Sequence, residues 1–288
     1  MINDTLLFAT ALIWGLAFVA QRVGTAYIGP FWFNGIRFML GAVSLLPLMV
    51  LLPDSGEKRS GKTLLIGGLV SGVCLFLGST FQQIGIHYTT AGNAGFITSL
   101  YVVLVPFIGM FFGYRSGKGR WTGALLAVCG LYLLGVNESL EINPGDGLVF
   151  ISAVFWAMHM LSLSYFSPRT NPVFLSCIQF AVTSVLSLCI AVFFEDFDTA
   201  RFGGAVVPLL YGGLMSVGVA YTLQVFAQKR AHPAHAAIIL SLEGAFAAVG
   251  GLLIIGETMD VRETAGCLLM LAGVIAAQWD TIRGRSAV

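Results

Sequence analysis

Residues 34–38 read Asn-Gly-Ile-Arg-Phe, and the related stretch Ser-Cys-Ile-Gln-Phe follows at residues 176–180. Trp14 and Trp156, Gln82 and Gln224, and Ser99-Leu100 and Ser241-Leu242 recur at the same offset of 142 positions. A recurrence of this length in a chain of apolar segments predicts two structural halves that meet around a central site.

The composition places the chain in a membrane. Apolar residues make up 57% of the 288 and charged residues 10%, and the mean hydropathy is +0.87. No water-facing globular surface tolerates that balance, so we expect an integral membrane protein. Because no segment alternates with a period of two residues, the spans are expected to be helices and the fold all-α.

Ten apolar runs are long enough, at roughly 18 to 24 residues, to cross a bilayer as helices. They lie at residues 5–22, 31–52, 63–86, 91–112, 119–136, 146–166, 172–194, 204–227, 233–256 and 262–279. The first run has no basic residues before it and no small-residue cleavage site after it, so we expect it to stay in the mature protein.

The placement of basic residues predicts the orientation. If the N-terminus is cytoplasmic, the inner loops and tail carry eleven basic residues, against three in the outer loops. The inner set is Lys58, Arg59, Lys62, Arg115, Lys118, Arg120, Arg169, Lys229, Arg230, Arg283 and Arg285, and the outer set is Arg22, Arg201 and Arg262. By the positive-inside rule, both termini are expected to be cytoplasmic.

Five helices per half is an odd number, so the second half must be inverted relative to the first. The charges of equivalent loops agree, because the loop with Lys58 and Lys62 corresponds to one with Glu195 and Asp198. We therefore predict an inverted five-plus-five repeat around a central cavity, with one half at residues 1–140 and the other at 141–288.

Several short motifs resemble those of one transporter family. They are Ile13-Trp14-Gly15, Ile36-Arg37-Phe38, Pro106, and Gly256-Glu257 followed by Thr264-Ala265-Gly266. Together with the ten spans they resemble the EamA-type branch of the drug/metabolite transporter superfamily. The short loops and the aromatic content are most similar to the YddG-type bacterial amino-acid exporters. In one departure, Gly256-Glu257 has no acidic counterpart in the first half, so Glu257 is expected to have a helix-end or packing role.

The resemblance implies an architecture and a location. The first four helices of each half would surround the cavity, and the fifth and tenth helices would lie at the periphery. It also implies transport by alternating access, in the bacterial inner (cytoplasmic) membrane.

Two charged residues lie within the spans, Arg37 and Glu243. A charge in a span costs roughly 2.5 to 3.5 kcal/mol on insertion scales, so both are candidates for function. Glu243 would contact a substrate ammonium group or bind a coupling proton, since a low-dielectric cavity disfavours its ionised form. The alternative is structural: an ion pair between the two, or separate capping of backbone groups.

Other polar and aromatic residues lie on the same helical faces as Arg37 and Glu243, or on the matching faces of the other repeat. We expect them to line the cavity; the alternative is that they form hydrogen bonds between helices or pack in the core. The full set of candidate cavity residues is Trp14, Asn34, Arg37, Ser79, Gln82, Gln83, Thr98, Tyr101, Trp156, His159, Tyr221, Gln224 and Glu243.

These residues favour a secondary transporter over an enzyme or a channel. We expect it to export small metabolites, most of all aromatic or apolar amino acids. The alternative transporter is a multidrug or organic-cation antiporter that uses Glu243 for protons. An enzyme is not expected because the spans hold no hydrolytic motif, and a channel is disfavoured because no ring of pore-lining polar residues is visible.

The expected partners are a small-molecule substrate, the lipid bilayer and, if transport is coupled, protons. All five cysteines lie in apolar spans without metal-ligand spacing, so no metal or cofactor is expected, and no nucleic acid. Small residues on the fifth and tenth spans suit close packing, and we favour packing within a monomer over a homodimer.

Overall fold

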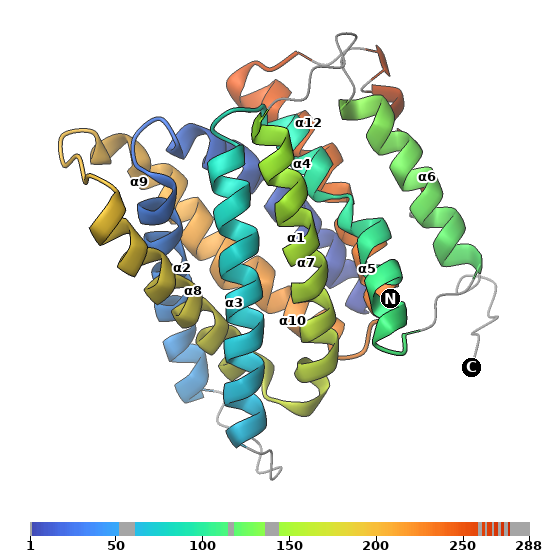
Figure 1. Ribbon diagram of the computed structural model, residues 1–288, viewed down its shortest axis with the longest axis horizontal. Helices are drawn as coiled ribbons and strands as arrows, with labels where there is room; N and C mark the ends of the chain where they lie inside the picture. The colour runs from blue at the N-terminus through green and yellow to red at the C-terminus, as the bar shows by residue number, and fades with distance from the viewer. Residues whose placement is uncertain are drawn as a thin grey trace.

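In a computed structural model the described part of the chain is all helical (Figure 1). The described residues are 2–51, 61–114, 118–135, 144–258 and scattered positions between 261 and 276. The first half contains α1 (Ile2–Gly24), α2 (Pro30–Leu51), α3 (Gly61–Gly85), α4 (Ala91–Thr98), α5 (Tyr101–Phe111) and α6 (Lys118–Gly135). The second half contains α7 (Pro144–Phe166), the 3-10 turn η1 (Ser167–Arg169), α8 (Pro172–Phe194), α9 (Phe202–Leu210), the π-helix η2 (Tyr211–Tyr221), α10 (Thr222–Gln228), α11 (Pro233–Leu240) and α12 (Leu242–Ile255).

Eight helical units of the described chain are long and apolar enough to cross a bilayer, as in a multi-pass membrane protein. They correspond to eight of the ten predicted spans. The fifth predicted span coincides with α6, which contains the apolar stretch Trp121–Gly130. The tenth, at 262–279, lies largely outside the described residues.

Two of the spanning units are broken in the middle. The fourth changes from α4 to α5 at Ser99-Leu100, and the eighth changes from α11 to α12 at Ser241. The breaks touch, because the Ser99 hydroxyl donates a hydrogen bond to the Ser241 carbonyl oxygen at 3.0 Å. Gly95 allows this approach, since a Cβ atom there would lie 2.6 Å from the Cβ of Ala247.

A third unit, at residues 202–228, contains the π-helix η2 between two α-helical segments. Side chains at the α1–η2 contact bind backbone carbonyls of the opposite element. The Trp14 indole N–H donates to Ser216 O at 3.3 Å, and the Tyr211 hydroxyl donates to Ile13 O at 3.0 Å. These bonds hold the widened π-turns against α1, and such turns often mark functional sites.

Side chains that bridge distant helices lie at both ends of the bundle. At the end where α1 and α3 finish, the Glu195 carboxylate accepts hydrogen bonds from Phe31 N and Trp32 N at 3.0 Å each. Glu257 accepts one from Ala91 N at 3.1 Å, which is the expected helix-end role. At the opposite end, His235 lies 2.8 Å from Asp4. Cross-links of this kind hold both ends together in this conformation.

Candidate functional site

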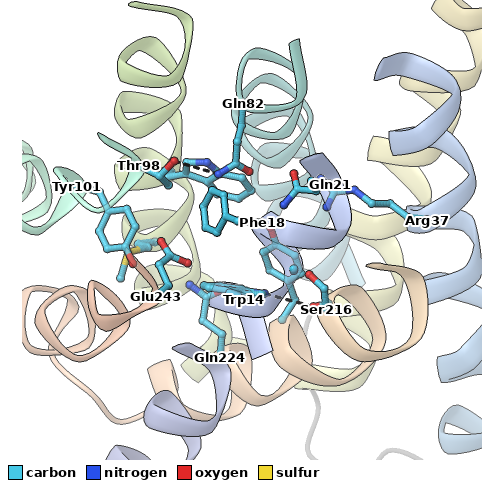
Figure 2. Close-up of a pocket in the computed structure, with 14 residues that line it drawn as sticks. Trp14, Phe18, Gln21, Arg37, Gln82, Thr98, Tyr101, Ser216, Gln224 and Glu243 are labelled. Carbon is cyan, nitrogen blue, oxygen red and sulfur yellow. Dashed lines mark hydrogen bonds between the residues drawn. The ribbon is translucent and has the colours of Figure 1, made fainter. Parts of the chain in front are cut away.

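A small cavity lies at the centre of the bundle, where α1, the α4–α5 and α11–α12 breaks, and η2 meet (Figure 2). Its free volume is about 30 Å³, which is room for one or two water molecules. The lining residues are Trp14, Ala17, Phe18, Gln21, Arg37, Gln82, Thr98, Tyr101, Trp156, Met160, Ser216, Tyr221, Gln224 and Glu243.

Glu243 provides the carboxyl group of the cavity. It lies two residues after the break at Ser241, in the first turn of α12, and its side chain is 3% exposed. Tyr101 lies two residues after the break at Ser99-Leu100, and Figure 2 shows its ring beside the Glu243 carboxyl group. The two breaks thus bring one polar side chain from each broken helix to the same wall of the cavity.

Arg37 provides the positive charge from α2, on the far side of Phe18 and Gln21 in Figure 2. It is 1% exposed, and its Nε donates to the Asn34 side-chain oxygen at 3.0 Å. Its guanidinium carbon lies 4.9 Å from the centre of the Phe38 ring, a favourable cation–π distance. Neither Arg37 nor Glu243 has an ion-pair partner among the described residues, so the structure does not contain the pair between them that was one structural alternative.

Aromatic rings form a continuous wall around Tyr221. Its ring centre lies 4.5 Å from that of Trp14 and 6.0 Å from that of Trp156, with which it is stacked. Phe38 and Phe180 lie behind it, at 6.0 and 5.9 Å. Such a wall favours a ligand with an apolar, aromatic or cationic group.

Six buried polar atoms that belong to lining residues make no hydrogen bond of normal geometry within the described structure, although the Tyr101 hydroxyl and the Glu243 carboxyl group interact with each other. The six atoms are Gln21 Oε1, Arg37 Nη2, Tyr101 Oη, Trp156 Nε1, Gln224 Oε1 and Glu243 Oε1. Buried polar groups are rarely left without partners, because each one costs the desolvation of that group. The lining atoms are six of the sixteen such atoms among the described residues, and they surround one cavity that has room for a hydrogen-bonding partner.

Nine of the thirteen residues predicted from the sequence line this cavity. They are Trp14, Arg37, Gln82, Thr98, Tyr101, Trp156, Tyr221, Gln224 and Glu243. Two of them, Gln82 and Thr98, are also joined by an interhelical hydrogen bond of 3.0 Å.

The other four predicted residues lie behind the wall. The Asn34 amide donates to Ser79 O at 3.1 Å and so supports Arg37. The Gln83 amide donates to Gln21 O at 3.3 Å. His159 is fully buried, with its Nε2 2.9 Å from Gln179 Oε1, and its ring packs against Trp156.

Five lining residues were missing from the sequence prediction: Ala17, Phe18, Gln21, Met160 and Ser216. Helical spacing contained a signal for three of them. Residues 17, 18 and 21 follow Trp14 at i+3, i+4 and i+7, the positions that share its face. Met160 has the same relation to Trp156, at i+4. Ser216 could not be found in this way, because its carbonyl faces α1 through the π-helix.

The described residues contain no group of three His, Cys, Asp or Glu side chains close enough to hold a metal ion. The lining residues of the cavity offer hydrogen-bonding groups, one carboxyl group, one guanidinium and aromatic faces.

Comparison with known sequences gives a family and several relatives. The profile of the EamA-like transporter family matches residues 1–136 and again residues 143–277. An uncharacterized transporter of Archaeoglobus fulgidus is 34% identical over 277 residues, which cover 94% of this chain and 84% of the relative. The uncharacterized transporter YoaV of Bacillus subtilis is 22% identical, with 93% and 94% covered. The uncharacterized inner membrane transporter YedA of Escherichia coli is 27% identical over 52% of this chain and 49% of its own length.

The fold is also present among solved structures. One crystal structure superposes with a TM-score of 0.78 over 99% of both chains, at 18% sequence identity. At that identity the likeness shows a shared fold.

Proposed function

This chain belongs to the EamA-like transporter family, and we propose that it is a secondary transporter that exports small metabolites by alternating access. The proposed substrates are amino acids, with aromatic or apolar ones favoured. The observation that carries the substrate class is the separation of Glu243 and Arg37 across one aromatic-walled cavity (Figure 2).

An amino acid is a zwitterion, so it needs an acceptor for its ammonium group and a donor for its carboxylate. Glu243 Oε1 and Arg37 Nη2 are such groups, and each is buried. A charged hydrogen bond in a low-dielectric site is stronger than one in water. An aromatic side chain of the substrate would contact Trp14, Trp156 and Tyr221.

The cavity must open for such a substrate to bind. Its 30 Å³ is too small for an amino acid, and cross-links close both ends of the bundle. Opening one end at a time, with the other still closed, is the essence of alternating access. We assign the present conformation to a closed intermediate of that cycle.

We further propose that the two halves, 1–140 and 141–288, form an inverted repeat of ten spanning helices with cytoplasmic termini. Support comes from the breaks at Ser99 and Ser241, which share the 142-residue offset, and from the two separate matches to the family profile. The name of the Escherichia coli relative supports a bacterial inner membrane as the location. We propose a monomer as the working unit.

The test is transport by purified protein in proteoliposomes, with and without a pH gradient. A competition screen across amino acids, their amines and organic cations would identify the substrate. We expect Glu243→Gln to lose most transport of zwitterions, and Glu243→Asp, which keeps the charge, to recover part of it. A gradient-dependent rate that Glu243→Gln abolishes would assign proton coupling to the same residue.

Two results would count against this proposal. If Glu243→Gln transports every ligand normally at every pH, the site assignment is wrong. If organic cations exchange for protons while amino acids are not transported, the protein is a cation antiporter instead.

A further inference from the structure

A second hollow lies on the flank of the bundle, along the last turns of α7. Its volume is about 370 Å³, within the range of small-molecule sites. It is lined by residues 70 and 74 of α3, by residues between 158 and 166 of α7, and by residues 112 and 114 after α5. Figure 1 shows α7 between α3 and α5 on this face, and α7 packs against both. We call this hollow the lateral groove.

The floor of the lateral groove is one face of α7. Four of its residues recur at i, i+3, i+4 and i+7, the spacing of a single helical face: Met158, Leu161, Ser162 and Tyr165. The Ser162 hydroxyl lies 2.8 Å from the hydroxyl of Ser71 on α3, so a hydrogen bond joins the two helices beside the floor. The groove is therefore built into the packing of α3 on α7.

A tight reversal of the chain after α5 builds the second wall. Gly113 has a φ of 83°, in the left-handed region that favours glycine. The Tyr114 N–H then donates back to Gly109 O at 3.0 Å, as at a helix C-terminus. This turn holds Phe112 and Tyr114 on the groove, opposite α3.

The lateral groove lies in the part of the bundle that lipid hydrocarbon surrounds. Val70 and Met158 are 43% and 41% exposed, and both belong to helical units long and apolar enough to cross a bilayer. Met158 precedes Phe166 by eight residues, so the groove extends about 12 Å from the end of α7 toward the middle of the bilayer. A long apolar hollow that opens sideways to lipid suits an acyl chain better than a water-soluble ligand.

A cation lies at the end of this groove. Arg169 follows α7 in η1, and its guanidinium carbon lies 4.0 Å from the centre of the Tyr165 ring. One of its N–H groups donates to Tyr165 O, and Arg169 is close enough to Tyr114 to interact with it electrostatically. A guanidinium has several N–H donors in a planar fork, so others are left for a phosphate group. Both tyrosines line the groove, and tyrosine is typical of the membrane interface, where lipid phosphates lie.

We propose that the lateral groove binds one anionic phospholipid, with an acyl chain along α7 and the phosphate group on Arg169. A headgroup with its own cation would be less favourable, because like charges repel at the guanidinium. In the proposed orientation this lipid belongs to the cytoplasmic leaflet. The binding does not depend on the proposed transport function.

The experiment is native mass spectrometry of the detergent-purified full chain, titrated with dioleoylphosphatidylglycerol or dioleoylphosphatidylcholine. The acyl chains are identical, so the difference in affinity measures the headgroup. We expect the first phosphatidylglycerol to bind at least fivefold more tightly than phosphatidylcholine. Arg169→Gln should remove most of that preference. Arg201→Gln, which removes the same charge at the other end of the bundle, should keep it.

Filling the groove tests the position of the acyl chain. Val70→Phe enlarges a side chain on the α3 wall, and Met158→Phe places a ring on the α7 floor. Each should weaken the binding of both lipids at least fivefold. Val73→Phe is the matched control, because Val73 is also 43% exposed on α3 but does not line the groove. It should bind both lipids like the wild type.

The outcomes decide each part of the proposal. If the wild type binds the two lipids equally, or if Arg201→Gln loses the preference as fully as Arg169→Gln, Arg169 does not hold the headgroup. If both groove-filling variants bind like Val73→Phe, the acyl chain does not lie in the groove. If millimolar inorganic phosphate displaces phosphatidylglycerol, the site is a phosphate site at Arg169 and the groove has no part in it.

Discussion

Arg37 and Glu243 are two ionisable residues buried within the membrane-spanning helices of the described chain. Each has an ionisable side chain, each is at most 3% exposed, and neither has an ion-pair partner among the described residues. Arg37 is partly satisfied by Asn34 and by the ring of Phe38, yet its Nη2 has no partner. A cation held rigidly in this way has one donor left for a ligand.

Replacing Arg37 should therefore separate two classes of ligand. Arg37→Gln removes a charged hydrogen bond worth about 1.5 to 3 kcal/mol, roughly a tenfold to hundredfold loss of affinity. The loss should fall on phenylalanine and spare phenethylamine, which has no carboxylate. Competition in proteoliposomes measures both, with Arg37→Lys as the charge-conserving control. An equal loss for the two ligands would show that Arg37 only supports the fold.

The broken helices are the elements that build the site. Each break ends one helix at mid-span and starts another, and the first turn of the new helix carries Tyr101 or Glu243. The two breaks can touch because glycines lie at the crossing. Gly244 lies against Ser99, and Gly95 lies against Ala247.

Two glycines of α4 should respond differently to alanine. Gly95→Ala would place a Cβ 2.6 Å from the Ala247 Cβ, which cannot rotate away, and we expect about 1 to 3 kcal/mol of destabilisation. Gly92→Ala, one turn earlier, meets its nearest atom at 3.6 Å and should be tolerated. Thermal unfolding in detergent compares the two. Equal stability of both variants would contradict the close crossing.

The π-helix depends on its bonds to α1. Trp14→Phe keeps an aromatic ring but removes the N–H that donates to Ser216 O, and Tyr211→Phe removes the hydroxyl that donates to Ile13 O. Each should cost about 0.5 to 1.5 kcal/mol, the net value of one hydrogen bond. Only Trp14→Phe should also change substrate affinity, because Tyr211 does not line the cavity. Thermal unfolding and substrate competition test the two parts, and an affinity change in Tyr211→Phe would contradict this division.

At the scale of the whole molecule, the two ends of the bundle differ in charge. The end where α1 and α3 finish carries Glu195, Asp196 and Asp198, whereas Lys62 and Lys118 lie in the first turns of α3 and α6 at the other end. Figure 1 shows the loop between α8 and α9 and the start of α3 at opposite ends. By the positive-inside rule, we propose that the end with Lys62 and Lys118 faces the cytoplasm.

The orientation can be tested with single cysteines in a cysteine-free chain. A membrane-impermeant maleimide added to intact spheroplasts should label Thr199→Cys and leave Lys62→Cys unlabelled until the membrane is opened. Both positions are exposed, so accessibility within the protein does not decide the result. Labelling of Lys62→Cys alone in intact spheroplasts would reverse the orientation.

The sequence by itself predicted the eight helical units of the described chain that are long and apolar enough to cross a membrane, and which polar residues share a face, because apolar length and helical spacing are local properties of the chain. It also identified nine residues of the cavity wall, because a polar side chain within a span is costly to bury and is therefore a candidate for function. The positions of the helix breaks and the π-turns were not predictable from the sequence, because they depend on which neighbouring helices pack against each helix and where.

Only the tertiary structure decided which polar groups face the cavity. Asn34, Gln83 and His159 are as polar as their neighbours on the cavity wall, yet partners on other helices withdraw them from it. Spacing along a helix fixes the direction of a side chain but says nothing of the group that it meets. The meeting of Tyr101 with Glu243 at two touching breaks is a property of the packed bundle, and it is there that the proposed substrate would bind.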